Sequence, residues 1–222
     1  MSRPPRPSMH GQHVHAMNRR VDRSRIFGAR SDYDRFASIL AWAQQQHAMP
    51  ITALCLMPNH WHLILRPQDS SHLSNFMHRL ETTHAAGFRS FTETRGHGSL
   101  YGGRFKSFPI APHRLLRSVV YVERNPVKAG LVDRATAWLH SSAASSATPP
   151  DWPQVTRLPH ELERLRAGLL RRPLPEEFEA EFRACCASAV PRHVRLAESA
   201  AREVRGALAS MDRERRSVQV SR

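Results

Sequence analysis

The sequence predicts an α+β domain with a mostly antiparallel sheet flanked by helices, followed by a C-terminal helical extension. Residues 51–57 and 60–66 are two apolar segments separated by the turn-forming pair Pro58-Asn59, which is the pattern of a tight β-hairpin. Along residues 12–125, strand-like and helix-like periods follow in the order strand, helix, strand, strand, helix, strand, helix. That order favours a ferredoxin-like arrangement.

The first half of the domain is predicted to place a short strand and a helix before the hairpin. Residues 12–18 form the strand. Residues 31–48 form the helix, with Ser31 as its N-cap and Asp34 at the capping-box position. The apolar face of this helix has the spacing of a helical stripe and consists of Phe36, Leu40 and Ala43.

The second half repeats the alternation of helix and strand. Residues 71–91 have helical apolar spacing, residues 104–110 alternate as a strand, and residues 113–125 form another helix. Pro126 ends or kinks this helix, because proline disfavours the α conformation at the residue before it. The apolar positions of the two helices are Leu73, Phe76, Met77, Leu80, Phe88 and Phe91 in the first, and Leu115, Leu116, Val119 and Val120 in the second.

Composition divides the chain into four parts. We expect residues 1–10 to be a disordered tail, 11–140 the folded domain, 141–156 a linker, and 157–222 a helical, basic extension. Amphipathic helices need a surface on which to bury their apolar stripe, so we expect the extension to dock on the domain or on a second subunit. A loosely ordered tail is the alternative. The stripe consists of Leu158, Leu162, Leu165, Leu169, Phe178 and Phe182.

The chain is strongly basic, with a formal net charge of +14 and a pI near 11.3. Such a charge favours a polyanionic partner, most often nucleic acid. Lysine occurs only at Lys106 and Lys128, so almost all of the positive charge is arginine, whose guanidinium suits bidentate phosphate contacts. A merely basic surface, with arginine favoured by codon usage, is the alternative.

Cysteine usage and hydropathy predict a cytoplasmic protein. Cys55, Cys185 and Cys186 show neither zinc-ligand spacing nor a disulfide framework. No apolar run approaches the roughly 20 residues that span a bilayer. The N-terminus is basic and lacks the apolar segment of a secretory signal.

The histidine pair His60-Trp61-His62 follows the hairpin turn directly. Side chains two residues apart on a strand share a face, so His60 and His62 point the same way and can chelate one divalent metal ion. A pair of surface histidines on an edge strand is the alternative. A second pair, at His13 and His15, lies near the basic N-terminus, and we expect it to be dispensable for metal binding. No third histidine or aspartate follows, which counts against a zinc hydrolase.

A second constellation, Tyr121 to Asn125, lies on the last predicted helix. Residues four apart share a helix face, so the phenol and the amide project together. The phenol can act as a nucleophile and form a covalent ester, and the amide oxygen can bind a metal ion. A tyrosine packed at a helix surface is the alternative. Nothing in the sequence identifies the base that would take the phenol proton.

Long motifs around these residues resemble those of the single-tyrosine transposases, and most closely the REP-associated tyrosine transposases. Residues 57–65, Met-Pro-Asn-His-Trp-His-Leu-Ile-Leu, are similar to the HUH motif of that family. Residues 121–132, Tyr-Val-Glu-Arg-Asn-Pro-Val-Lys-Ala-Gly-Leu-Val, are similar to its nucleophile helix and the turn after it. Residues 101–108 resemble its basic strand. The resemblance covers roughly residues 10–145 and makes 11–140 the catalytic domain.

The resemblance implies a reaction and its residues. Tyr121 is the nucleophile, His60 and His62 are metal ligands, and Asn125 stands where this branch places its third ligand. The metal is Mg²⁺ or Mn²⁺. The substrate is single-stranded DNA with hairpins, cleaved and rejoined through a 5′-phosphotyrosine with release of a 3′-hydroxyl.

Four cations are candidates for DNA binding. Arg104 and Lys106 share a strand face, and Arg117 precedes Tyr121 by one helical turn; Lys128 follows the helix. Phosphate clamping is the functional interpretation, and a solvated basic face is the alternative.

Two other functions compete with a DNA-cleaving enzyme. The first is a domesticated relative that binds structured nucleic acid without cutting it, which would have the same fold, charge and partner as the enzyme. A metallohydrolase of unrelated fold is disfavoured by the missing third histidine or aspartate. The sequence is compatible with a homodimer, and leaves open whether Tyr121 attacks within its own subunit or in a partner.

Overall fold

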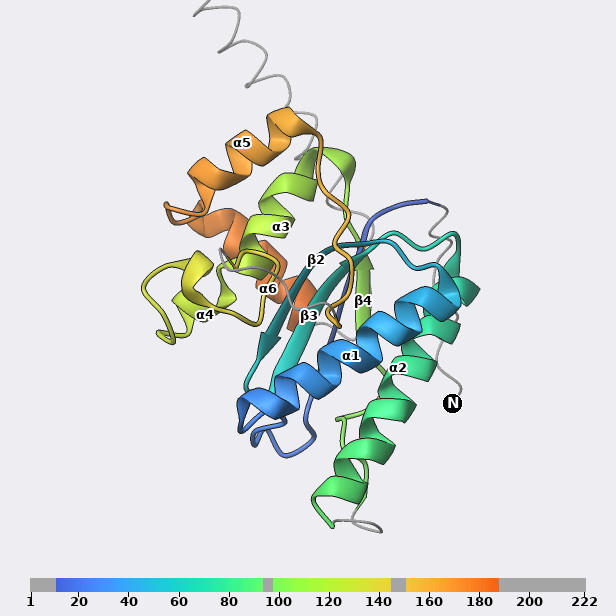
Figure 1. The fold of residues 1–222 in the computed structure, drawn as a ribbon. Helices are drawn as coiled ribbons and strands as arrows, with labels where there is room; N and C mark the ends of the chain where they lie inside the picture. Colours follow the sequence, from blue (N-terminus) through green and yellow to red (C-terminus); the bar gives the residue numbers. More distant parts are fainter. Residues whose placement is uncertain (1–10, 94–97, 145–150, 188–222) are drawn as a thin grey trace, which may run out of the picture. The chain divides into compact units, whose positions relative to one another are not determined.

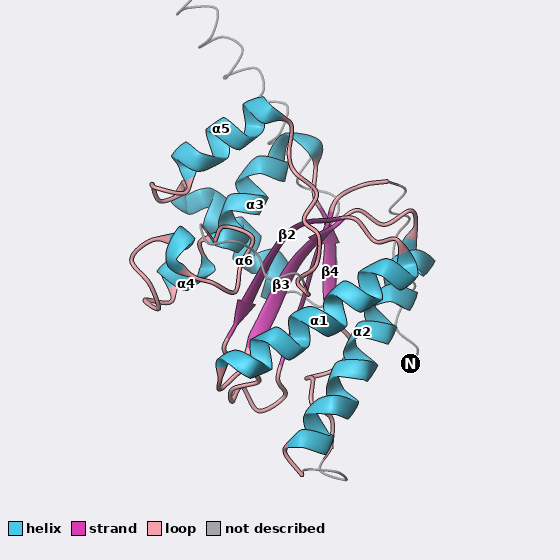
Figure 2. Ribbon diagram, viewed as in Figure 1, coloured by secondary structure: helices cyan, strands magenta, loops and turns pink. Residues whose placement is uncertain are grey.

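The structure is a computed structural model that describes residues 11–93, 98–144 and 151–187. A four-stranded antiparallel sheet in the order β2-β3-β1-β4 forms its centre (Figures 1 and 2). Its strands are β1 (Val14–Arg19), β2 (Ile51–Met57), β3 (His60–Leu65) and β4 (Lys106–Pro109). This order, with helices between β1 and β2 and between β3 and β4, confirms the ferredoxin-like prediction.

Helices cover both faces of the sheet. On one face lie α1 (Arg30–His47) and α2 (Ser70–Phe91), and on the other lies α3 (Leu115–Glu123) (Figure 1). Trp61, Leu63 and Leu65 belong to the core under α1 and α2, whereas Ile64 packs with α3. The alternation along β3 therefore turns His60 and His62 away from the main core and toward the α3 side.

The start of α1 differs from the prediction. The helix begins at Arg30, after Ala29, and not after Ser31. The Asp32 carboxylate accepts hydrogen bonds from the backbone N–H groups of Gly28 and Ala29, both at 2.9 Å. Because Asp32 satisfies donors that lie before the helix, the first turn forms without a capping side chain at its N-cap, and Asp34 is not needed there.

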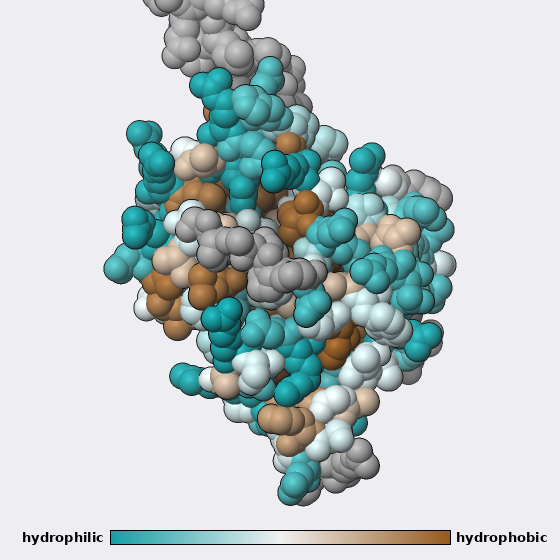
Figure 3. Space-filling model, viewed as in Figure 1, coloured by the Kyte–Doolittle hydropathy of each residue, from teal (hydrophilic) through white to brown (hydrophobic). Residues whose placement is uncertain are grey.

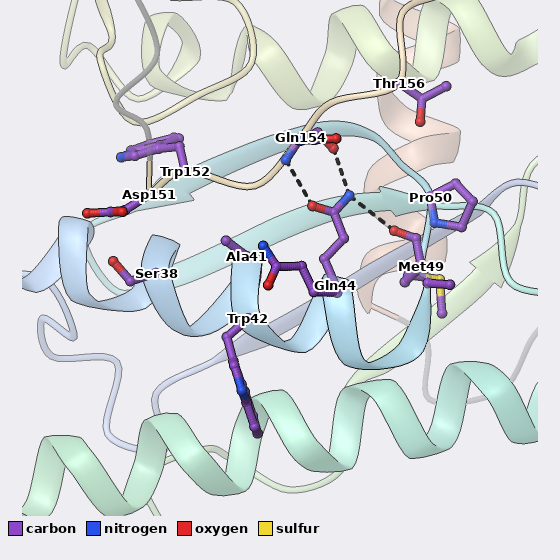
Figure 4. A pocket seen from close by; sticks show the side chains of 12 residues that line it. Ser38, Ala41, Trp42, Gln44, Met49, Pro50, Asp151, Trp152, Gln154 and Thr156 are labelled. Carbon is purple, nitrogen blue, oxygen red and sulfur yellow. Dashed lines mark hydrogen bonds between the residues drawn. The ribbon is translucent and has the colours of Figure 1, made fainter.

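The segment predicted as a linker makes specific contacts with the sheet and with α1 where the structure describes it. Ser142 donates to the Leu54 carbonyl, and Trp152 is buried in the main core. Gln44 on α1 bonds both backbone groups of Gln154, with its Nε2 donating to the carbonyl at 2.7 Å and its Oε1 accepting from the N–H at 2.9 Å (Figure 4). The Gln44 side chain therefore satisfies both backbone groups of Gln154 and holds residues 151–156 against α1.

The described part of the extension consists of α5 (His160–Leu169) and α6 (Glu176–Ala187), which belong to the same compact unit as the sheet. Arg166 on α5 donates to the buried carboxylate of Glu123 on α3 at 2.8 Å. Leu165 is exposed, unlike the rest of the predicted stripe. The predicted tail 1–10 and the arginine-rich end 188–222 lie outside the described residues.

The surface seen in Figure 3 is mostly hydrophilic, with small apolar patches. In the described ranges, no helix is both long enough and apolar enough to cross a membrane.

Candidate active site

One cavity of about 710 Å³ brings together most of the residues singled out in the sequence. The imidazoles of His60 and His62 reach it from β3, and Tyr121 and Asn125 reach it from the end of α3. Of the four predicted DNA-binding cations, three line it as well, namely Arg104, Lys106 and Lys128. Arg117 does not line it and is half-buried one turn before Tyr121. The cavity therefore joins the two predicted constellations, which lie about sixty positions apart in the chain.

The ring of His60 is oriented by the residue before it. Its Nδ1 lies 2.6 Å from Oδ1 of Asn59, and the Asn59 amide nitrogen donates to the Arg23 carbonyl at 2.8 Å. Because that second bond fixes which end of the amide is oxygen, His60 must donate from Nδ1. Its Nε2 then carries a lone pair that is available to a ligand.

The ring of His62 is held by another histidine. Its Nδ1 lies 2.9 Å from Nε2 of His15 on β1, and both rings are buried. Its other nitrogen, Nε2, is buried and has no hydrogen-bond partner among the described residues. Buried polar atoms are rarely left without a partner, so an unpartnered imidazole nitrogen at a cavity fits a metal ligand.

Burial keeps both imidazoles neutral. It lowers the pKa of His60 to about 3, with a further contribution from the positive charge of Arg19. Burial also lowers the pKa of His62 well below its ordinary value, followed by the charges of the neighbouring histidines and Arg19. Neutral imidazole is the form that binds metal ions.

Asn125 follows the last turn of α3 and begins the short helix α4 (Asn125–Lys128), with Pro126 as its second residue. The Asn125 amide nitrogen donates to the carbonyls of Tyr121 and Val122, at 3.0 and 3.2 Å. Carbonyls only accept, so these bonds assign the nitrogen and leave the amide oxygen for another partner. An amide oxygen suits Mg²⁺ and Mn²⁺. In the described chain, no cluster of three or more histidine, cysteine, aspartate or glutamate side chains offers a competing metal site.

Tyr121 lies under helix α6 and is only 4% exposed. The ring of Phe182 packs against the phenol ring at a centroid distance of 4.2 Å. On another side, Lys128 Nζ lies 4.4 Å from the ring centroid and pairs with Glu179 of α6 at 2.7 Å. Burial raises the pKa of the phenol above its ordinary value. Sequence periodicity indicated that α6 would dock, but gave no signal that it would dock here.

Four further cationic side chains, which were not among the candidates predicted from the sequence, also line the cavity. They come from the end of β1, the turn after it, and α6, and they are Arg19, Arg20, Arg23 and Arg183. Arg23 adopts a left-handed backbone conformation, with a φ of 61°. The run Arg19-Arg20 directly after a predicted strand was a signal that could have found part of this set.

A comparison with protein families identifies the class of protein that carries this sheet and this basic cavity. A family model described as "Transposase IS200 like" matches residues 8–125, just over half of the chain. The chain belongs to this IS200-like transposase family.

Two solved structures are similar to this chain. A REP-associated tyrosine transposase bound to a REP hairpin is 24% identical, with a TM-score of 0.51, and the match covers 69% of this chain and 92% of the other. A putative transposase from Deinococcus radiodurans R1 is 18% identical, with a TM-score of 0.40, and the match covers 56% of this chain and 95% of the other. No curated protein matches. At 24% identity and a TM-score of 0.51, the first of these structures supports the fold.

Proposed function

We propose that this transposase cleaves and rejoins single-stranded, hairpin-containing DNA through a 5′-phosphotyrosine intermediate with the help of a divalent metal ion. The observation that carries the proposal is the unpartnered Nε2 of His62 in the same cavity as Tyr121. The solved relative that is bound to a REP hairpin supports hairpin DNA as the substrate class.

Three side chains would hold the metal ion. His60 and His62 offer neutral imidazole nitrogens, and Asn125 offers an amide oxygen. Mg²⁺ or Mn²⁺ held there supplies positive charge to a phosphate oxygen and orients the phosphodiester. The hydrogen bonds behind the ligands, from Asn59, His15 and the α3 carbonyls, fix the ligand atoms before any substrate arrives.

Tyr121 acts as the nucleophile. Its phenolic oxygen forms a bond to phosphorus as the phenol proton passes to solvent, and the bond from phosphorus to the 3′-oxygen breaks while that oxygen takes up a proton from solvent and leaves as a 3′-hydroxyl. Attack by a 3′-hydroxyl on the phosphotyrosine reverses these bond changes and rejoins the strand. Around the cavity, Arg104, Lys106 and Lys128 contact backbone phosphates, and Arg117 extends this set along α3.

A second candidate function is binding of structured nucleic acid without cleavage. The observation that favours it is the packing of Phe182 on the Tyr121 ring, which leaves the residue only 4% exposed and leaves little room for a DNA strand beside the phenol in this arrangement of α6. Under the cleavage proposal, α6 moves aside when the substrate enters.

A covalent-adduct assay separates the two functions. The full chain is incubated with labelled single-stranded DNA hairpins and Mg²⁺ or Mn²⁺, and a denaturing gel is run. Cleavage gives a covalent protein–DNA band that Tyr121→Phe removes while hairpin affinity stays nearly unchanged. A wild type that binds hairpins and never forms the band supports the binding function. Tyr101→Phe is the matched control, because Tyr101 is buried against Trp61 and His84 and should leave the band intact.

A further inference from the structure

His15 is buried on β1 beside the proposed metal ligand His62. Its register partner on β3 is Ile64, so the His62 side chain lies diagonally across the strand pair. The two ring planes differ by only 20°, their centroids are 5.0 Å apart, and the nitrogens face each other at 2.9 Å. Phe108 and Phe182 pack around the rest of the His15 ring. The His15 ring therefore cannot turn freely.

Only one proton lies between the two facing nitrogens, and its location decides what His62 can do. If His15 donates it, neutral His62 carries its own proton on Nε2, where it is buried without an acceptor among the described residues and cannot bind a metal ion. If His62 donates from Nδ1, its Nε2 presents a lone pair to the cavity. The second arrangement places the proton of His15 on Nδ1.

A sulfur atom faces that second nitrogen of His15. Cys186 Sγ on α6 lies 3.8 Å from His15 Nδ1, within the range of a weak hydrogen bond to sulfur. In this arrangement both nitrogens of His15 and Nδ1 of His62 have a hydrogen-bond partner. The one nitrogen of the two rings left without a partner is Nε2 of His62, whose lone pair faces the cavity. This proton arrangement is the one that a metal ligand requires.

We propose that His15 is a positioning residue for the metal site, which accepts the Nδ1–H of His62 and thereby fixes the His62 tautomer with Nε2 free to bind the metal. The inference rests on the proposed function, since it assigns a role to His15 through a proposed ligand. It also reverses the expectation from sequence that His15 is dispensable for metal binding. That expectation considered His13 and His15 as a pair and could not include the contact across strands.

The test compares Mn²⁺ binding to full-length variants by titration calorimetry. His15→Phe keeps an aromatic ring of similar size and removes the acceptor, so it should weaken Mn²⁺ binding by about 10- to 100-fold. His15→Gln places a carbonyl oxygen near the position of Nε2 and should recover most of that affinity. His13→Phe, one residue before the same strand, is the matched control and should bind Mn²⁺ as the wild type does. The thermal unfolding midpoint of each variant, compared with that of the wild type, tests whether the variant is folded.

A second readout does not involve metal. Nitrogen-15 NMR of the histidine rings in the metal-free protein should show His62 with its proton on Nδ1 in the wild type and in His15→Gln, and a shift toward the Nε2-protonated form in His15→Phe. A wild-type His62 protonated on Nε2 would overturn the inference, as would unchanged Mn²⁺ affinity in a folded His15→Phe. Direct coordination of Mn²⁺ by His15, detected as a third bound imidazole in pulsed electron paramagnetic resonance, would overturn it too.

Failure of the proposed function gives a different pattern. If neither His60→Ala nor His62→Ala lowers Mn²⁺ affinity, the metal site itself is misplaced. If both variants lose Mn²⁺ affinity and His15→Phe keeps it, the proposed metal ligands are supported and only the role of His15 is rejected.

Discussion

His60 and His62 show how neighbours give two identical side chains defined roles. Each ring is held through Nδ1, His60 by an amide oxygen and His62 by a second imidazole. The spacing of the pair on a strand was readable from the sequence, because it depends only on the alternation of side chains. The groups that hold the rings were not readable, since Asn59 needed the turn geometry and His15 needed the strand order.

Loss of any one of the proposed metal ligands should greatly reduce cleavage. His60→Ala, His62→Ala and Asn125→Ala each remove a donor atom, and each should reduce Mn²⁺ affinity by more than the roughly 10- to 100-fold that changes behind the ligands cause. Calorimetry and the covalent-adduct gel measure the two effects. His13→Ala should change neither, and a chelator should stop the wild type. Metal binding lost in His13→Ala but kept in His60→Ala would contradict the assignment.

Arg23 combines a strained backbone with a place at the cavity. Its φ of 61° is unfavourable for any residue with a side chain, and the conformation is held by Asn59 donating to its carbonyl. Arg23→Gly should therefore stabilise the protein by about 1 kcal/mol, because glycine adopts this conformation without strain. It should also weaken hairpin binding, through loss of a phosphate contact. Thermal unfolding and hairpin affinity measure the two effects, and a glycine variant that binds hairpins as the wild type does would exclude Arg23 from the DNA interface.

At the scale of elements, the hairpin, the order of strands and helices, and most of the faces they bury followed from periodicity, although Phe91 of the predicted α2 stripe is exposed. Trp61, Leu63 and Leu65 fill the main core, because alternation on a central strand places them on the face opposite His60 and His62. The start of α1 was missed, since Asp32 acts on donors outside the helix and sequence rules look first for a capping side chain at its boundary. The place where α6 docks was also missed. A pair of phenylalanines indicates that a helix is buried, but not against what.

Helix α6 should control access to the nucleophile. Phe182→Ala removes the ring that packs on Tyr121, so the covalent adduct should form several-fold faster at saturating DNA. The same change should cost about 3–5 kcal/mol of packing, most of it in the docking of α6 and not in the sheet. Gel quantification of adduct against time measures the rate. Phe91→Ala, at an exposed position at the end of α2, is the control and should change nothing. A folded Phe182→Ala variant with an unchanged rate would show that α6 does not limit access.

At the scale of the whole molecule, the positive net charge predicted a nucleic-acid partner. Membership of a transposase family agrees with that prediction. The predicted boundaries agree less well with the packing. Residues 141–144 and 151–156 are bonded to β2 and α1, and α5 and α6 belong to the same compact unit as the sheet. Composition could not show this, because a Ser-, Ala- and Pro-rich segment resembles a tether whether or not its backbone pairs with a strand. We therefore propose that the catalytic unit extends to residue 187.

The remaining residues, 188–222, carry eight arginines and four acidic side chains, a surplus of positive charge outside the catalytic unit. We expect them to contact DNA phosphates, so truncation after residue 187 should weaken hairpin binding and leave adduct formation by Tyr121 possible. Each phosphate contact contributes about 0.7–0.9 to the slope of log affinity against log salt, so the truncated chain should show a shallower slope. Hairpin affinity of the two chains at several salt concentrations measures this. A truncation after residue 150 is less informative, because it also removes the buried Trp152 and leaves Glu123 without Arg166. Equal affinities and equal slopes for the full chain and the chain ending at residue 187 would show that the end of the chain does not bind DNA, and that the cations around the cavity supply the whole electrostatic contribution.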